Sequence, residues 1–137
     1  MTAADLDAAI GAARFAADGL LPAIIQEEST RDVLMLGYMD AEALRRTLSE
    51  GRVTFWSRSR NEYWRKGDTS GHFQYVRAAA FDCDSDALLV TVHQIGPACH
   101  TGAHSCFEVG PLAPAVGEPA AAGGEPAASD TPAAEEA

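Results

Sequence analysis

The chain is organised around residues 81–107, F-D-C-D-S-D-A-L-L-V-T-V-H-Q-I-G-P-A-C-H-T-G-A-H-S-C-F, in which residues 87–94 are typical of a β-strand. This stretch holds all three cysteines of the chain, three of its four histidines and three alternating carboxylates. They are Cys83, Cys99 and Cys106; His93, His100 and His104; and Asp82, Asp84 and Asp86. Thiolates and imidazoles suit zinc, whereas carboxylates suit magnesium or calcium, so the stretch predicts two kinds of metal site.

The D-x-D-x-D pattern does not fit a calcium-binding EF-hand loop. Counted from Asp82, the sixth residue is Ala87 instead of glycine and the twelfth is His93 instead of glutamate. On a β-strand the three aspartates would share one face, with neighbours ~6.6 Å apart, so a third carboxylate reaches a shared ion only if the chain bends. A solvated acidic turn is the alternative interpretation.

The cysteine spacing does not match a structural zinc knuckle, because six residues separate Cys99 from Cys106 and Cys83 lies far upstream. Three thiolates would leave one position of a tetrahedral zinc open, as a catalytic site requires. The alternative is three buried, unligated cysteines. The fourth zinc ligand stays open between water, His93, His100 and His104.

Two polar segments have the groups that bind phosphate and ribose. S-R-S-R at residues 57–60 offers guanidinium donors, and K-G-D-T-S-G-H at residues 66–72 offers hydroxyls and glycines whose backbone amides can approach a ligand. The arginines belong to a basic cluster, for which a solvated strand face is the alternative interpretation. The cluster consists of Arg52, Arg58, Arg60, Arg65 and Lys66. His72 is either a proton carrier or an ordinary polar loop residue.

The composition excludes several classes of partner. The net charge is -10, and about half of it lies in residues 111–137, which contain no lysine or arginine. An acidic body argues against general nucleic-acid binding. The N-terminus does not resemble a secretory signal, and no apolar run approaches the ~20 residues that span a bilayer. We therefore expect a soluble, cytoplasmic protein without a disulfide framework.

The remaining chain predicts short alternating elements. Residues 2–18 have the periodicity of an amphipathic helix, and a second helix follows the cap Asp40 and ends at Gly51. Residues 20–26 and 33–39 predict a hairpin, with Pro22 placing its first strand at an edge or at the strand start. Further strands are expected at 52–59, 62–66, 74–80 and 87–94. Residues 111–137, rich in Ala, Pro and Glu, are expected to be disordered.

With these motifs laid out, the chain closely resembles the phosphoribosyl-AMP cyclohydrolase family of histidine biosynthesis. The resemblance runs from about Gly19 to Phe107 through G-L-L-P-A-I-I-Q, V-L-M-L-G-Y-M, S-R-S-R, W-R-K-G-D-T-S-G-H, D-C-D-S-D and G-P-A-C-H-T-G-A-H-S-C-F. It implies one compact α+β domain over residues 1–110, dominated by antiparallel strands with an N-terminal and a central helix, in an obligate homodimer. Gly37 and Asp68 depart from the usual alanine and glutamate.

The resemblance also implies a set of site residues. One zinc per subunit would be shared across the dimer, bound by Cys83 of one subunit and by Cys99 and Cys106 of the other. Magnesium would bind Asp82, Asp84 and Asp86. The expected reaction is hydrolytic opening of the adenine ring of phosphoribosyl-AMP by a zinc-bound hydroxide, with His100 or His72 moving the proton. Residues expected to bind substrate are Arg58, Arg60, Trp64, Lys66, Ser70 and His72.

Two alternatives make different predictions. A zinc nucleobase deaminase shows H-x-E followed by P-C-x-x-C, and this chain has neither H-x-E nor that cysteine spacing. A zinc-stapled interaction domain would need the metal for folding alone. In that case the acidic trio could be neutralised without consequence.

Overall fold

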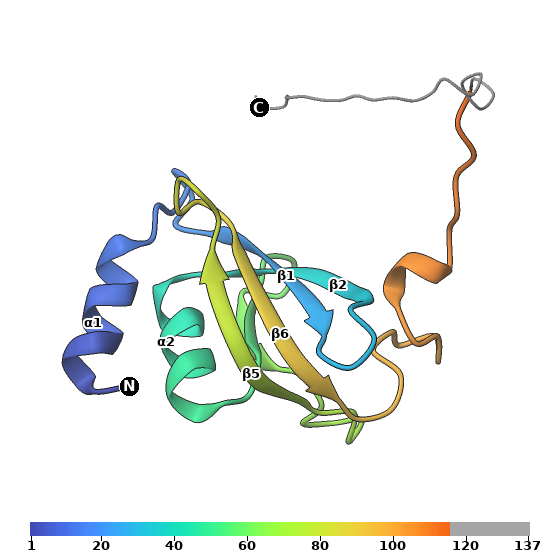
Figure 1. The fold of residues 1–137 in the computed structure, drawn as a ribbon, viewed down its shortest axis with the longest axis horizontal. Coiled ribbons are helices and arrows are strands. Elements are labelled where there is room, and N and C mark those ends of the chain that lie inside the picture. The colour runs from blue at the N-terminus through green and yellow to red at the C-terminus, as the bar shows by residue number, and fades with distance from the viewer. Residues whose placement is uncertain (116–137) are drawn as a thin grey trace.

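The computed structural model describes residues 1–115, which form an α+β fold around two β-sheets (Figure 1). The larger sheet has four strands in the order β2-β1-β6-β5, and the smaller is the hairpin of β3 and β4. The elements are α1 (Ala3–Ala12), β1 (Leu21–Glu27), β2 (Val33–Met39), α2 (Ala41–Glu50), β3 (Thr54–Ser57), β4 (Glu62–Arg65), β5 (Gln74–Phe81), β6 (Leu88–Gln94) and η1 (Cys106–Glu108). The predicted α+β class is confirmed.

The four-stranded sheet is mixed. β1 pairs antiparallel with β2 and β5 pairs antiparallel with β6, while β1 and β6 run parallel in the centre. Pro22 was expected at an edge or at a strand start, and it is at the start: it is opposite Tyr38 of β2, but the ladder with β6 begins one residue later, at Ala23. The edge position is wrong, because β1 lies inside the sheet; the missing N–H costs nothing where no ladder bond is required.

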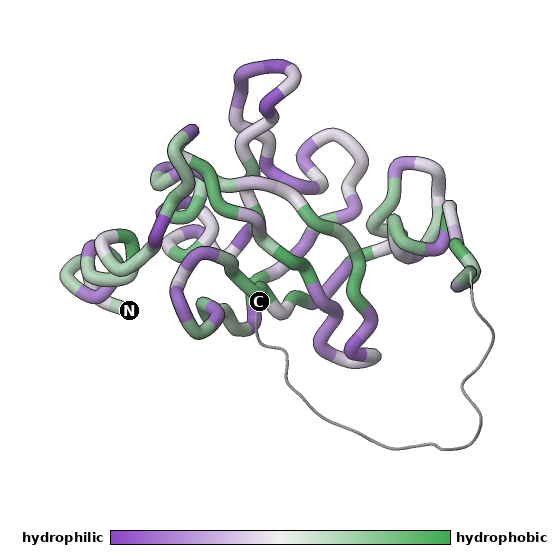
Figure 2. The backbone as a smooth tube through the Cα atoms, turned by 90° about the horizontal axis from the view of Figure 1, so that it is seen from above, coloured by the Kyte–Doolittle hydropathy of each residue, from purple (hydrophilic) through white to green (hydrophobic). Residues whose placement is uncertain are grey.

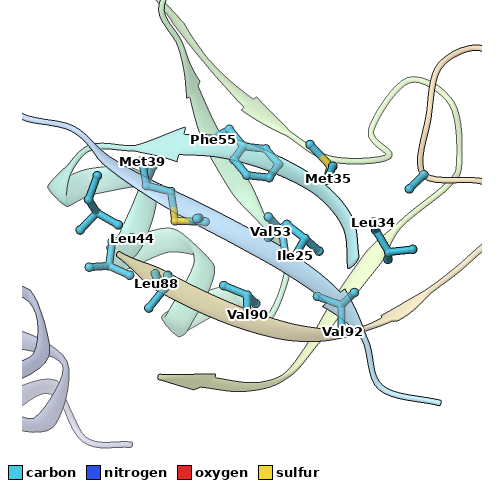
Figure 3. Packing of buried hydrophobic residues seen from close by; sticks show 14 residues of the cluster. Ile25, Leu34, Met35, Met39, Leu44, Val53, Phe55, Leu88, Val90 and Val92 are labelled. Atoms are coloured by element: carbon cyan, nitrogen blue, oxygen red, sulfur yellow. The ribbon is translucent and has the colours of Figure 1, made fainter. Parts of the chain in front are cut away.

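The hydrophobic core lies between one face of this sheet, α2 and the β3–β4 hairpin (Figure 3). Helix α2 begins at Asp40, whose Oδ1 accepts a hydrogen bond from the Ala43 N–H at 2.8 Å, and it ends at Gly51, whose φ of 73° is left-handed. Phe55 from β3 is buried against β2. The packing fixes α2 and β3 against the four-stranded sheet, and the two loops that line the site follow β4 and β6.

Helix α1 is shorter than the sequence predicts. It ends at Ala12 instead of near residue 18, and Ala13 is already extended with ψ of 138°. The next residue, Arg14, donates its N–H to the carbonyl of Ser85 at 2.8 Å. This long-range bond to the β5–β6 turn draws the chain out of the helix, against its alanine-rich propensity.

Strand β3 is also shorter than the predicted range 52–59, because the chain turns at Asn61, whose φ is 54°. Figure 2 shows hydrophobic residues along the strands and hydrophilic ones mainly in the peripheral loops. No helix among the described residues is long and apolar enough to cross a bilayer. The predicted disordered segment 111–137 falls mostly outside the described residues.

Candidate active site

A cavity of about 260 Å³ lies where the loop after β4 meets the loop after β6. It gathers residues from both polar motifs of the sequence. Its lining is Trp64, Lys66, Gly67, Thr69, Ser70 and His72 from one side, and Cys99, His100 and Gly102 from the other. The structure therefore brings both candidate proton carriers, the candidate zinc ligand Cys99 and four predicted substrate-binding residues to one place.

The two thiols of the loop after β6 lie near each other beside this cavity. A hydrogen bond from the Thr101 hydroxyl, 3.1 Å from Cys99 Sγ, lowers the pKa of the Cys99 thiol, and interaction with Cys106 adds to this. Desolvation raises the pKa of the Cys106 thiol, and its interaction with Cys99 acts in the same direction. One thiol of the pair is thus easier to ionise than the other, which suits ligation of a soft cation.

Lys66 links the thiol loop to the β3–β4 hairpin. Its side chain is buried, and Nζ donates a hydrogen bond to the carbonyl of Ala98, the residue before Cys99. Burial lowers the pKa of Lys66, while Cys106 and Cys99 act in the opposite direction. The ammonium group therefore compensates negative charge at the thiol pair as well as facing the cavity.

The position of His72 depends on a glycine across the cavity wall. Gly96 has a φ of +69°, and a Cβ at this position would lie 2.6 Å from Cδ2 of His72. The His72 backbone is held as well, because its N–H donates to Ser70 Oγ at 3.1 Å. The imidazole therefore occupies space that only a glycine leaves open.

A second cavity, of about 520 Å³, adjoins the first at Trp64. It contains the S-R-S-R motif. Arg58 stacks its guanidinium over the ring of Tyr38 at 3.9 Å from the centroid, and Arg60 lies 3.4 Å from the Glu62 carboxylate. Both predicted phosphate-binding arginines thus lie together in a cavity that shares one wall with the thiol site.

The three aspartates lie in the turn between β5 and β6, between the two strands expected from the sequence, and the chain bends there as a shared ion would require. Ser85 has a φ of 62°, which bends the chain. As a result, one ligand oxygen from each of Asp82, Asp84 and Asp86 lies within 4.8 Å of the others. All three are exposed, and their donor set fits a hard cation such as magnesium.

Crowding perturbs these carboxyl groups in opposite directions. Hydrogen bonds with Asp84 and then Asp82 raise the pKa of Asp86. At Asp82, desolvation acts upward, but hydrogen bonds from Asp86 and Ala87 outweigh it and lower the pKa. Asp82 Oδ1 accepts the Asp86 N–H at 3.1 Å, so this carboxylate also builds the turn. Three close carboxylates without a cation repel each other.

Cys83 is not brought to the other two thiols within one chain. It lies in the β5–β6 turn, before β6 begins, whereas Cys99 and Cys106 follow the far end of that strand (Figure 1). β6 alone spans ~20 Å at ~3.3 Å per residue, far beyond the ~4 Å between sulfurs that share a zinc ion. His93 lies within β6, opposite Tyr75 of β5, and is exposed.

Three residues that shape this site were not predicted from the sequence. Thr101 lies in the quoted C-H-T-G motif, where a hydroxyl two residues after a cysteine was the available signal. Gly96 and Glu27 carry no local signal, because their contacts with His72 and His104 join distant parts of the chain. His104, one candidate fourth ligand, places Nε2 3.1 Å from the Glu27 carboxylate.

One thiol, two imidazoles and an ammonium group line one cavity, beside a second cavity with two guanidinium groups. This set of groups is typical of an enzyme site for a phosphorylated ligand. A family model described as phosphoribosyl-AMP cyclohydrolase matches residues 35–108. The chain belongs to the phosphoribosyl-AMP cyclohydrolase family. This membership favours a cyclohydrolase over the deaminase and interaction-domain alternatives.

Three relatives with the same family name match this chain over most of their lengths. The chain is 66% identical over 113 residues to the phosphoribosyl-AMP cyclohydrolase of Leifsonia xyli subsp. xyli, covering 82% of this chain and 90% of that protein. It is 67% identical over 113 residues to that of Clavibacter sepedonicus, covering 82% of each chain. With that of Bifidobacterium longum it shares 70% identity over 97 residues, covering 70% of this chain and 74% of the relative.

Proposed function

We propose that this chain hydrolyses phosphoribosyl-AMP, opening the six-membered ring of its adenine. As a member of the family it is a hydrolase of histidine biosynthesis that acts on a cyclic amidine bond. The observation that carries the proposal is the cavity in which Cys99, His72, His100 and Lys66 converge, inside the region matched by the family model. We place the reaction in the cytoplasm.

Zinc is the proposed catalytic metal, bound by Cys99, Cys106 and the Cys83 of a second subunit. The fit is supported by the proximity of the first two thiols and by the lowered pKa of Cys99. When bound, zinc supplies Lewis acidity and makes water nucleophilic at neutral pH. The thiolate set leaves one coordination position for that chemistry.

The chain's own residues have separable roles in this proposal. The imidazole of His72 or His100 takes up the proton released as water adds to the ring, since both line the cavity. Trp64, which forms a wall of both cavities, packs against the base or ribose. Arg58 and Arg60 bind a phosphate in the neighbouring cavity.

His72→Asn and His100→Asn distinguish the two candidate proton carriers. Substitution of the true carrier should lower kcat by ~10²–10⁴-fold, and substitution of the other histidine should lower it less.

A homodimer is proposed because three thiols cannot meet in one chain. If a two-fold axis passes near the middle of β6, perpendicular to the strand, and relates two copies face to face, the β6 strands run in opposite directions. The Cys83 end of one strand then lies beside the end of the partner strand that leads to Cys99 and Cys106. Two equivalent sites form at opposite ends of the pair.

The sheet face opposite the core suits such a contact. Four residues in register, one from each strand, form an apolar row across it: Leu36, Ile24, Leu89 and Ala80. Leu36 is 42% and Leu89 36% exposed in the single chain. Burial of an apolar row that crosses the whole sheet would stabilise a dimer.

Magnesium is the proposed ion of the acidic turn, held by Asp82, Asp84 and Asp86. The crowding of their oxygens within 4.8 Å supports this, because a divalent cation removes the repulsion between them. Arg14, Asp84 and Asp86 together line a further cavity of about 520 Å³. A cation there lies next to space for an anionic group of the substrate.

The direct test is turnover of phosphoribosyl-AMP, followed by absorbance, before and after treatment with a zinc chelator. The proposal predicts turnover that the chelator abolishes and added zinc restores. Cys99→Ser should lose zinc and turnover together. Full activity of a zinc-free protein would refute the metal assignment, and ammonia release from AMP would favour a deaminase.

A further inference from the structure

We propose that Glu27 and His104 act as a positioning pair that holds the Cys99–Cys106 loop in the geometry required to capture zinc. The inference rests on the proposed function, since it takes these two thiols to be metal ligands. Neither residue of the pair lines the cavity, so both act through the loop.

Glu27 is a buried carboxylate whose partner is on the thiol loop. It lies at the end of β1 and is 8% exposed. His104 Nε2 lies 3.1 Å from Glu27 Oε1 and 3.3 Å from the exposed carboxylate of Asp32. Among the described residues, His104 is the basic side chain within ion-pair distance of Glu27. A buried carboxylate without a basic group beside it is costly, so this contact favours one loop position.

The backbone transmits this constraint to the thiols. The carbonyl of His104 accepts the N–H of Ala98 at 3.1 Å, and the N–H of Cys99 donates to Ala103 at 3.1 Å. These two bonds close the loop, so that fixing His104 fixes Cys99. On the other side, the hydroxyl of Ser105 donates to the carbonyl of Val33 at 2.7 Å, just before Cys106.

A metal site at the pair itself is the competing interpretation, since imidazole and two carboxylates are ligand types for zinc. The geometry does not support it. Within residues 1–115, the one group of three potential ligands whose donor atoms all lie within 4.8 Å of each other is the aspartate trio. Glu27 and Asp32 therefore flank the imidazole instead of converging with it on one ion.

The test compares three variants of the full chain: His104→Ala, Glu27→Gln and the double variant. Zinc affinity is measured by competition with a chromophoric chelator, and amide hydrogen exchange at Ala98 and Cys99 is measured on metal-free protein. His104→Ala leaves Glu27 buried and unpaired, so we expect zinc affinity to fall by ~10–100-fold and both amides to exchange faster. Adding Glu27→Gln removes the stranded charge, so the double variant should bind zinc more tightly than His104→Ala alone.

Two further variants separate positioning from general destabilisation. His104→Gln keeps a donor at about the place of Nε2 and should restore most of the affinity. Glu28→Gln alters the neighbouring, exposed carboxylate, whose partner is Arg77 at 3.6 Å, and should leave zinc affinity and loop exchange at parental values.

The outcomes are distinguishable. Unchanged loop exchange in His104→Ala, faster exchange with parental zinc affinity, or additive effects in the double variant would each overturn the positioning role. Failure of the parent protein to bind zinc would instead contradict the proposed function, and this inference would fall with it.

Discussion

Cys83 and Cys99 lie at opposite ends of β6, one in the turn before the strand and the other in the loop after it. A strand of seven residues keeps the two thiols apart more rigidly than a loop would. Any site that uses both must therefore be completed by another copy of the chain. This relationship makes the dimer a functional requirement of the proposal, and it connects the uncovered face of the sheet with catalysis.

Substitutions in the acidic turn between β5 and β6 can separate metal binding from formation of the turn. Within residues 1–115 the Asp84 side chain accepts no backbone hydrogen bond that holds the turn. Asp84→Asn should therefore relieve repulsion and leave the metal-free unfolding temperature unchanged or higher. The same variant should need about tenfold more magnesium for half-maximal activity. Thermal unfolding and a magnesium titration of activity measure the two effects.

Asp82→Asn is the matched comparison. Asp82 Oδ1 accepts the N–H groups of Asp86 and Ala87 at 3.1 and 3.3 Å, so this variant should lose stability even without metal. Equal metal-free destabilisation by Asp84→Asn and Asp82→Asn would show that the trio is a structural turn instead of an ion site.

Gly96→Ala should displace His72 without removing any ligand. The new Cβ would lie 2.6 Å from His72 Cδ2, so the imidazole must move by about an ångström. If His72 and not His100 is the proton carrier, misplacement on that scale lowers kcat by ~10²-fold. Zinc affinity should stay within about twofold of the parent in either case. Steady-state kinetics and chelator competition measure these quantities on the same preparation.

Gly51→Ala controls for backbone strain. Gly51 has a φ of +73°, similar to that of Gly96, but no atom of the described part of the chain lies within 4 Å of its Cβ position. It should lose ~1–2 kcal/mol of stability and keep its kcat. If both variants lost kcat alike, strain instead of the contact with His72 would be the cause.

Tyr63→Phe should change how the free energy of unfolding depends on pH in the alkaline range. Burial, followed by the hydrogen bond that Tyr63 donates to Asp40 Oδ2 at 2.7 Å, raises the pKa of this tyrosine from 10.0 to about 12. The folded state holds the phenolic proton more tightly than the unfolded state, so this contribution is complete below pH 10 and is lost as the pH rises toward 12. The variant should lose ~1 kcal/mol at neutral pH and show a flatter stability curve between pH 10 and 12.

Denaturant unfolding across that pH range provides the measurement. As a control, Tyr75→Phe changes an exposed tyrosine of β5. Its free energy of unfolding should change with pH as steeply as that of the parent. If the free energy of unfolding of Tyr63→Phe fell with pH as steeply as that of the parent, the half-buried phenol would not contribute to the alkaline loss.

The sequence predicted those parts of the fold that depend on local signals. α2 has its predicted bounds because Asp40 and Gly51 cap the helix within the segment itself. The end of α1 is different: its periodicity continues past Ala12, but a bond from Arg14 to Ser85 determines where the helix stops. No local sequence pattern indicates that contact.

The candidate site divides in the same way. The motifs that contain Lys66, His72 and Cys99 identified residues that the fold does bring together. The residues that hold them in position could not be predicted from the sequence, because Gly96 and Glu27 act through contacts that exist only once the sheet has formed. The aspartates were recognised by type and spacing, but the bend at Ser85 that gathers them was left open as a condition.

The central claim is that one metal site is built from two copies of the chain, and mixed dimers test it most directly. Cys83→Ser and Cys106→Ser are purified separately, then unfolded and refolded together in equal amounts. Each variant alone should lack zinc and turnover, because every site in its dimer is damaged. In a mixed dimer one site receives both substitutions and the other receives none, so the mixture should recover about a quarter of the parental activity and zinc content. Formation of mixed dimers without any recovery, or a Cys83→Ser protein that keeps its zinc and its activity, would contradict the account.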